Sequence, residues 1–259
     1  MMLHPSVSAA GVRLVAHDVL DSTNAHALLL ARAGERGPLW IVARSQTAGR
    51  GRRGRVWLSP PGNLFGTLLL AAPSPPEKLP QLSLVTALAI YDAVSESAEK
   101  LEPQIVIKWP NDILLGGAKL AGVLVEAERI VDDTVVAIGI GVNCASHPDQ
   151  TEYPATDLAA AGAPVTLEAL FSSLSFAMHR RLAQWNQGEG FERARADFIA
   201  RAAFVGQRIG IRLAKRTLEG TFEALDANGN LMLRLDNHRA ETIAAGDVFM
   251  LTRSAAKEA

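Results

Sequence analysis

Residues 105–142 read IVIKWPNDILLGGAKLAGVLVEAERIVDDTVVAIGIGV. This stretch contains three apolar runs joined by short connections, at 105–109, 120–126 and 134–142. Short apolar runs between turn signals are typical of buried strands. The segment before them, residues 82–98, has apolar residues at helical spacing and predicts a helix that faces the core. We therefore expect a sheet packed against at least one helix.

The flanking segments extend this pattern in both directions. Asp21-Ser22-Thr23-Asn24 supplies N-cap residues for a helix at 25–33, which ends at Gly34. Further helices are expected at 167–185 and 191–203, after a loop. Additional strands are predicted before the opening stretch, at residues 12–19, 39–43 and 64–71.

The character of the chain changes at Gly206. Asp226-Ala227-Asn228-Gly229 lies between two short strand-like segments, and Asn-Gly is a strong hairpin signal. We predict an α+β fold, with a mixed-sheet domain at residues 12–204 and a small β-barrel at residues 205–253. Strands of the barrel are expected at residues 209–213, 218–225, 231–235, 240–243 and 248–251.

Composition excludes several classes of protein. The 259 residues include 26 lysines and arginines against 27 aspartates and glutamates, a net charge of −1, which argues against a disordered polyelectrolyte and a generally basic nucleic-acid binder. A single cysteine, Cys144, excludes an intramolecular disulfide. No apolar run approaches the roughly 20 residues needed to cross a bilayer, and no secretory signal is apparent. We expect a cytoplasmic protein without a nucleic-acid or membrane partner.

Positive charge is nevertheless concentrated in one loop, Gln46-Thr47-Ala48-Gly49-Arg50-Gly51-Arg52-Arg53-Gly54-Arg55-Val56-Trp57. Four arginines and three glycines fall within seven of its residues. The glycines match G-x-G-x-x-G, but a β-like Val-Trp follows where a dinucleotide site has a helix. Glycines allow close backbone approach, and arginines bind phosphate or carboxylate. The loop has three interpretations: a flexible surface loop, an RGG-like nucleic-acid contact, or a phosphate site whose loop becomes ordered over its ligand. The rigid segment that begins at Trp57 favours the phosphate site.

Three further segments carry candidate site residues. Asn111 and Asp112 follow a strand that Pro110 ends; they are either a metal or base site or a simple turn. Lys119 opens a largely buried strand, where it needs an anionic partner unless its end is solvated. Gly122 would permit close approach of a ligand, whereas Gly139 and Gly141 suit packing against a ring system or a neighbouring backbone, or else mark a bulge. The six histidines show no metal-ligand spacing, so no metal site is assigned.

Taken in order, these segments resemble the biotin protein ligase family, also called biotin–[acetyl-CoA-carboxylase] ligase. The resemblance covers about residues 15–252. It rests on Asp21-Ser22-Thr23-Asn24, Gln46 through Arg55 with Trp57, Lys108-Trp109-Pro110-Asn111-Asp112, Lys119-Leu120-Ala121-Gly122 and Gly139-Ile140-Gly141-Val142-Asn143. It implies a catalytic domain of the biotin/lipoate ligase type followed by an SH3-like barrel.

The resemblance also implies a two-step reaction. Biotin and ATP, with Mg²⁺, form biotinoyl-AMP, and a lysine of a carboxylase's biotin carrier domain then takes the biotin and releases AMP. No enzyme nucleophile is required, so catalysis rests on positioning and charge neutralisation. The implied catalytic residues are Lys119, Arg52 and Asp112. The implied binding residues are Ser22, Thr23, Asn24, Gln46, Gly49, Arg50, Gly51, Arg52, Trp57, Asn111, Lys119, Gly122 and Gly141.

By the same resemblance, Ser22, Thr23 and Gln46 contact the ureido end of biotin, and Lys119 binds the biotin carboxylate and the α-phosphate. Whether Asp112 serves a metal or the target amine stays open, as do the oligomeric state, monomer or homodimer, and the carboxylase that is modified. Some family members carry an N-terminal DNA-binding domain and act as repressors. The catalytic domain here begins by about residue 12, so we expect an enzyme without repressor function.

Other classes are less compatible with these residues. A lipoate ligase would use the same adenylation logic, but its arginine pair and glycine triad before His-Asp are absent. A nucleic-acid-binding module conflicts with the net charge and with the lack of aromatics among Gly49 to Arg55. A regulatory biotin-binding protein without ligase activity is disfavoured by Lys119 and the intact arginine loop.

Overall fold

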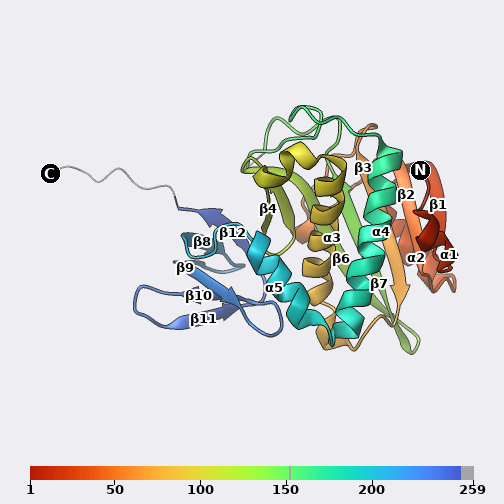
Figure 1. The fold of residues 1–259 in the computed structure, drawn as a ribbon. Coiled ribbons are helices and arrows are strands. Elements are labelled where there is room, and N and C mark those ends of the chain that lie inside the picture. Colours follow the sequence, from red (N-terminus) through yellow and green to blue (C-terminus); the bar gives the residue numbers. More distant parts are fainter. Residues whose placement is uncertain (152, 252–259) are drawn as a thin grey trace.

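A seven-stranded mixed sheet forms the centre of the larger part of the molecule (Figure 1). The computed structural model describes residues 1–151 and 153–251. The strand order is β1-β2-β3-β7-β6-β5-β4; β1 and β2 pair in parallel and the other neighbours are antiparallel. The strands are β1 (Arg13–Leu20), β2 (Leu39–Gln46), β3 (Leu64–Ala71), β4 (Ile105–Lys108), β5 (Asp112–Leu115), β6 (Ala118–Ile130) and β7 (Asp133–Val142).

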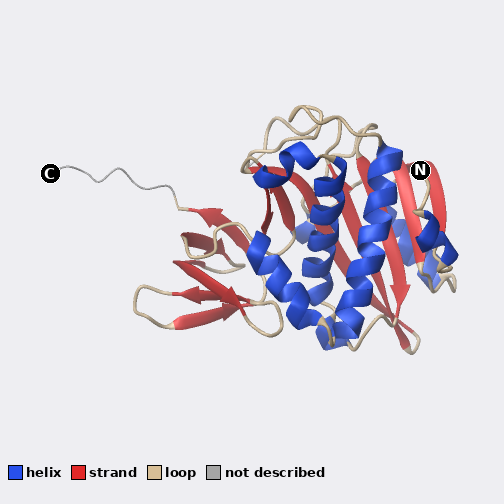
Figure 2. Ribbon diagram, in the orientation of Figure 1, coloured by secondary structure: helices blue, strands red, loops and turns tan. Residues whose placement is uncertain are grey.

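Helices cover the two faces of this sheet unequally (Figures 1 and 2). Alternate residues of a strand point to opposite faces. Trp40 and Ile138 therefore face the larger core, under α3 (Gln81–Ser97), α4 (Leu167–Trp185) and α5 (Phe191–Arg201). Ile41 and Ala137 face α2 (Thr23–Arg32) on the other side. The remaining helical segments are α1 (Pro5–Ala9) and the 3₁₀ turns Arg52–Gly54, Pro76–Lys78, Glu99–Gln104 and Asn186–Gly188.

The opening stretch of sequence contains one strand more than its three apolar runs predict. Pro110 follows β4, and a turn bond from the Asn111 amide to the Lys108 carbonyl (3.2 Å) reverses the chain. Residues 112–115 then pair with β4 and with β6 as strand β5. Because this strand is only four residues long, its apolar part reads in the sequence as a connection. Helix α1 was not expected either.

The C-terminal strands form a separate five-stranded antiparallel sheet of order β11-β10-β9-β8-β12. The expected hairpin is confirmed: Asp226 accepts from the amides of Asn228 (2.8 Å) and Asn230 (2.9 Å), and Gly229 has φ +86°. The strands are β8 (Arg208–Arg212), β9 (Thr217–Leu225), β10 (Leu231–Arg234), β11 (Ala240–Ile243) and β12 (Asp247–Met250).

The expected closure of this sheet into a barrel is not observed. Within residues 1–151 and 153–251 no ladder joins β11 to β12, so the hydrogen-bonded sheet stays open at these strands. A hydrophobic pattern predicts short strands but does not specify which two edges pair. Residues 252 and 253, the end of the predicted second domain, lie outside the described residues. The division between residues 204 and 205 stays a prediction.

The second sheet packs against the first part of the molecule through its hairpin turn. The Trp109 indole N–H donates to the Gly229 carbonyl at 3.0 Å, and Trp109 is buried. A Cβ on Gly229 would lie 2.9 Å from Phe191 and 3.1 Å from Leu84, so only glycine permits this approach. The turn therefore holds the C-terminal sheet beside α3, α5 and β4.

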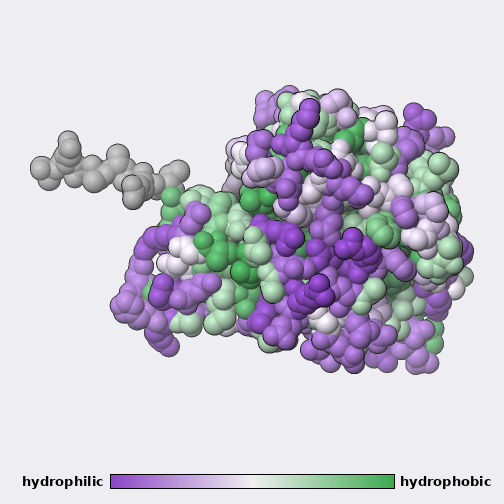
Figure 3. Space-filling view, viewed as in Figure 1, coloured by the Kyte–Doolittle hydropathy of each residue, from purple (hydrophilic) through white to green (hydrophobic). Residues whose placement is uncertain are grey.

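Hydrophilic residues cover much of the outward face of the helices (Figure 3). Among the helices described, none combines the length and the apolar character that a membrane span requires.

Burial of the single cysteine gives a first testable consequence. Cys144 is buried, and this raises the pKa of its thiol to about 12. Thiolate is the reactive form, so at pH 8 only about one thiol in 10⁴ is ionised. We expect no labelling of the native protein by iodoacetamide at pH 8 and complete labelling in denaturant, measured by intact mass spectrometry. Rapid labelling of the native protein would contradict the buried position.

Candidate active site

A cavity of about 450 Å³ opens where β5, β6 and β7 meet the start of α2 and the arginine loop. Segments far apart in the sequence line it, including residues 148–155 and Asp247 of the C-terminal sheet. Almost all residues expected in the site line this one cavity: Ser22, Thr23, Asn24, Gln46, Arg50, Gly51, Arg52, Trp57, Asn111, Asp112, Lys119, Gly122 and Gly141.

Gly49 is the exception among the expected residues. It belongs to the loop but does not line the cavity; a Cβ there would be 2.4 Å from the Trp57 carbonyl oxygen and 2.5 Å from Ser59 Oγ. The Gly49 carbonyl also accepts a hydrogen bond from the Trp57 amide at 2.9 Å. Gly49 therefore serves the packing of the loop, and its expected direct contact with ligand stays unsupported.

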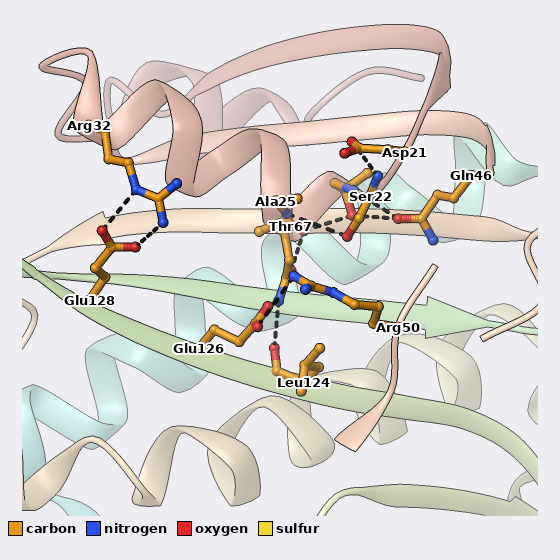
Figure 4. A network of polar contacts seen from close by, with 12 residues as sticks. Asp21, Ser22, Ala25, Arg32, Gln46, Arg50, Thr67, Leu124, Glu126 and Glu128 are labelled. Atoms are coloured by element: carbon orange, nitrogen blue, oxygen red, sulfur yellow. Dashed lines mark hydrogen bonds and ion pairs between the residues drawn. The ribbon is translucent and has the colours of Figure 1, made fainter. Parts of the chain in front are cut away.

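One end of the cavity is lined by the neutral polar side chains at the N-terminus of α2, with the Arg50–Glu126 ion pair beside them (Figure 4). Ser22 is the N-cap, with its side chain accepting from the Ala25 amide at 3.4 Å. The Thr23 amide donates to Gln46 Oε1 at 2.8 Å, and Gln46 Nε2 donates to Ser59 Oγ at 2.8 Å. Ser22, Thr23 and Ser59 are buried and Gln46 is partly buried, and these hydrogen bonds hold the groups in fixed directions at the cavity.

Asn24 is fixed from both sides of its amide group. Its Nδ2 donates to Glu126 Oε2 at 2.8 Å and to the Leu124 carbonyl at 3.2 Å, while its Oδ1 accepts from Thr67 Oγ1 at 2.6 Å. Asn24 also fills the space above Gly139, where a Cβ would lie 2.3 Å from Asn24 Oδ1. The amide has no room to turn, and the space beside Gly139 is occupied by this amide side chain rather than by the expected ring system or neighbouring backbone.

The arginine loop folds back on itself over the cavity. Arg50 and Val56 form an isolated antiparallel bridge, and the Gly51 amide donates to the Arg55 carbonyl at 2.7 Å. Arg52 turns inward and donates to Asn111 Oδ1 at 2.8 Å. Burial lowers the pKa of Arg52, which nevertheless remains a guanidinium cation at neutral pH. The mobility expected of the loop without ligand stays a prediction.

Trp57 closes the loop against the sheet. A Cβ on Gly141 would lie 2.5 Å from Trp57 Nε1, and one on Gly122 would lie 3.4 Å from the edge of the ring. The two glycines therefore form a flat surface on β6 and β7 that accepts the indole ring. Lys119 Nζ lies 5.4 Å from the centre of the same ring.

At the charged end of the cavity, Asp112 lies between Lys119, which lines the cavity, and Lys108, which lines a smaller pocket beside it. Lys119 Nζ lies 2.6 Å from Asp112 Oδ1, so Asp112 is the anionic partner that the sequence required for Lys119. Lys108 Nζ lies 3.7 Å from Asp112 Oδ2 and 4.4 Å from the centre of the Tyr153 ring. Burial lowers the pKa of Lys108. With Arg52 nearby, this end carries more cations than anions and suits an anionic ligand.

Several residues of the site were missed in the sequence. Glu126, Thr67 and Asp247 each contact an expected residue or its loop, but they stand 43 to 194 positions away from it in the chain. Lining residues of the same kind are Arg55, Leu58, Asn143 and the segment that includes Gln150 and Tyr153. Arg55 belongs to the arginine loop and Asn143 ends another motif that the sequence did single out, so loop composition and strand-end position were usable signals for these two residues. The others carry no local signal.

No resident metal site is formed by the described side chains. Within residues 1–151 and 153–251, no group of three or more His, Cys, Asp or Glu residues is arranged to hold an ion. The carboxylates at the cavity are already paired: Asp112 with Lys119, Asp247 with Arg55, and Glu126 with Arg50 at 3.5 Å. These residues therefore do not fit a protein-held metal ion.

Fold and cavity together define a ligand-binding domain for a small molecule that has an uncharged polar end and an anionic end. Residues 17–143 match the biotin/lipoate A/B protein ligase family, and residues 204–251 match the biotin protein ligase C-terminal domain. A biotin–[acetyl-CoA-carboxylase] ligase of Paracoccus denitrificans is 41% identical, covering 88% of this chain and 97% of that protein. The chain therefore belongs to the biotin protein ligase family.

Solved structures agree with this assignment. The biotin protein ligase from Aquifex aeolicus, in complex with biotin and ATP, has a TM-score of 0.76 and 24% identity, covering 92% of this chain and 97% of that chain. This likeness shows the fold. The biotin protein ligase from Leishmania major in complex with biotinyl-5-AMP has a TM-score of 0.64 and 26% identity, covering 90% and 99% of the two chains.

Proposed function

We propose that the protein activates biotin with ATP to biotinoyl-AMP and then transfers the biotin to a lysine of a carboxylase carrier domain. The observation that carries this proposal is the polarity of the cavity: neutral hydrogen-bonding groups lie at one end, and Arg52 and Lys119 lie at the other, with Lys108 behind Asp112 outside the cavity lining. A biotin adenylate has the same polarity, with a ureido ring at one end and a phosphate at the other. The family membership supports the same reaction.

In the first step, the carboxylate oxygen of biotin attacks the α-phosphorus of ATP and pyrophosphate leaves. Both reactants are anions that repel each other. Lys119 and Arg52 would neutralise the carboxylate and the phosphate as these come together, which lowers the barrier electrostatically. Ser22, Thr23 and Gln46 would hold the ureido ring, and the fixed ring position would aim the carboxylate at the phosphorus.

In the second step, the neutral amine of the carrier lysine attacks the acyl carbon, an amide forms and AMP leaves. Asp112 lies between Lys108 and Lys119, at the charged end where this amine would arrive. We assign Asp112 to positioning the amine and the two lysines, and Trp57 with the arginine loop to excluding water from the acyl-adenylate.

Magnesium enters this proposal with the nucleotide. Mg²⁺ commonly binds substrate phosphates with few protein ligands. Since the described carboxylates at the cavity are paired with cations, we propose that the triphosphate brings the ion, and we assign no protein ligand to it.

ATP and a carboxylase carrier domain as co-substrates fit the expected cytoplasmic location, without a nucleic-acid partner. β1 lies at the edge of the sheet, so a monomer and a homodimer both stay open.

The test is an exchange assay followed by mass spectrometry. We expect the purified protein to catalyse exchange of pyrophosphate into ATP that requires biotin and Mg²⁺, and to add one biotin to the lysine of a carrier-domain peptide. Lipoate serves as the matched control substrate. Exchange with lipoate alone would select the rival ligase, and no exchange with either acid would refute the proposed function.

Glu126 offers a specific prediction for the biotin end. Glu126→Ala removes an acceptor from the buried Asn24 amide, and an unpaired buried donor costs about 1–3 kcal/mol. We expect the KM for biotin to rise at least about fivefold and the melting temperature to fall by several degrees.

The matched control for this variant lies on the same strand. Glu128 is two residues along β6, on the same side, and pairs with Arg32 away from the cavity (Figure 4). Glu128→Ala should leave the KM for biotin unchanged. Equal effects of the two variants would mean that Glu126 does not support the biotin end.

A further inference from the structure

Asp247, the first residue of β12, lies under the arginine loop although it belongs to the C-terminal sheet. Its side chain is only 9% exposed. Oδ2 accepts from Arg53 Nη1 at 2.8 Å and from Arg55 Nη2 at 2.5 Å. The carbonyl of the preceding residue, Gly246, accepts from Arg52 Nη2 at 3.4 Å. One short segment of the C-terminal sheet thus contacts three consecutive cations of the loop.

The loop needs such an anionic partner in order to stay closed. It holds four arginines and no acidic residue from Arg50 to Arg55, so its own charges repel. Arg53 has φ +57°, in the left-handed region that residues other than glycine rarely adopt. Strained conformations of this kind persist when surrounding contacts hold them. The two ion pairs with Asp247 are such contacts, because they fix Arg53 and Arg55 on either side of the turn.

We propose that Asp247 is a positioning residue that latches the arginine loop to the C-terminal sheet and so retains the acyl-adenylate in the cavity. It acts through Arg53 and Arg55, whose closed position keeps Arg52 on Asn111 and Trp57 on Gly141. The inference rests on the proposed function. It assigns to the C-terminal sheet a task in the catalytic cycle, namely keeping the intermediate until the carrier lysine arrives.

Loss of the latch has a defined chemical result. Biotinoyl-AMP that escapes reacts with water: the water oxygen attacks the acyl carbon, the acyl–phosphate bond breaks, and biotin and AMP are released with the proton. Each such event consumes one ATP and yields pyrophosphate and AMP without biotinylating the carrier. The ratio of AMP formed to biotin transferred therefore measures retention. This ratio does not depend on how much of the enzyme is folded, because inactive molecules contribute to neither product.

The experiment measures that ratio with full-length protein, biotin, ATP and a carrier domain at limiting concentration. Asp247→Asn removes the charge while preserving the shape of the side chain. We expect the ratio to rise at least about fivefold over the unmodified protein, since a buried charge pair loses its anion. Asp236→Asn is the control: Asp236 also pairs with an arginine, Arg208, in the same sheet, but it is exposed and does not line the cavity. Its ratio should stay unchanged.

A second variant tests the route through the loop. Replacing both Arg53 and Arg55 by Gln should raise the ratio as Asp247→Asn does, and adding Asp247→Asn to it should raise the ratio no further. An unchanged ratio for Asp247→Asn, or a full additional increase in the triple variant, overturns the inference. The same experiment distinguishes a failure of the latch from a failure of the proposed function, because in the second case the unmodified protein forms no biotin-dependent AMP.

Discussion

Replacing Lys119 by Met is expected to abolish most adenylate formation. The side chain keeps its length and loses its charge, so the biotin carboxylate and the α-phosphate meet without the cation between them. Removal of one preorganised donor at a developing charge costs roughly 10²–10³-fold in rate. Asp112 would in addition keep only Lys108 as its partner, 3.7 Å away, and leave more negative charge near the phosphate. We expect biotin-dependent exchange to fall at least about a hundredfold.

Binding and folding measurements separate this effect from damage to the fold. Lys119 lies at the start of β6 with its side chain partly exposed, so the melting temperature should change little. Lys100→Met, at an exposed position far from the cavity, provides the control for loss of one positive charge and should keep full exchange activity. Activity of Lys119→Met within about tenfold of the unmodified protein would place the reacting groups elsewhere.

Gly139→Ala should have the second large effect, at the other end of the cavity. The added methyl group would lie 2.3 Å from Asn24 Oδ1 and 2.9 Å from Asn24 Cγ, so the buried amide must move. Movement breaks its bonds to Thr67 and Glu126 and leaves buried polar groups unpaired, at about 1–3 kcal/mol. We expect biotin affinity to fall at least about tenfold, measured by titration calorimetry in the absence of ATP.

A glycine on the neighbouring strand tests the specificity of this effect. A Cβ on Gly66 of β3 would lie 3.4 Å from Val42 and 3.5 Å from Trp40, which are ordinary contact distances. Gly66→Ala should therefore bind biotin as the unmodified protein does. If Gly139→Ala also binds biotin normally, the N-terminus of α2 is not the biotin end of the cavity.

Much of the candidate site could be predicted because its residues stand next to local signals. Ser22 to Asn24 precede a helix, the arginine loop is unusual in composition, and Asn111 with Asp112 follows a proline that ends a strand. Lys119 opens a buried strand, and a lysine in such a position requires an anionic partner. Such features depend only on residues that are neighbours in the chain, so they can be recognised in the sequence.

Other predictions failed where the outcome depends on pairing between distant segments. Strand β5 has too few residues to show a period, and only its ladders with β4 and β6 define it. Closure of the C-terminal sheet was expected but not found for a related reason, since alternation predicts strands but not which edges join. The contact of Gly49 with ligand, expected from the family resemblance, stays a prediction; in the fold, Gly49 packs against Trp57 and Ser59.

The sequence by itself determined most of the helices and strands, the concentration of positive charge in one loop and the family to which the loop and its companion motifs belong. Only the tertiary structure decided what holds those groups in place. Glu126 stands 102 positions from Asn24, and Asp247 stands 192 positions from Arg55. The strand order of the sheet and the packing of the C-terminal hairpin against the first domain bring these pairs together. Because ion pairs and hydrogen bonds act over a few ångströms, a partner so distant in the chain leaves no local trace until the fold is formed.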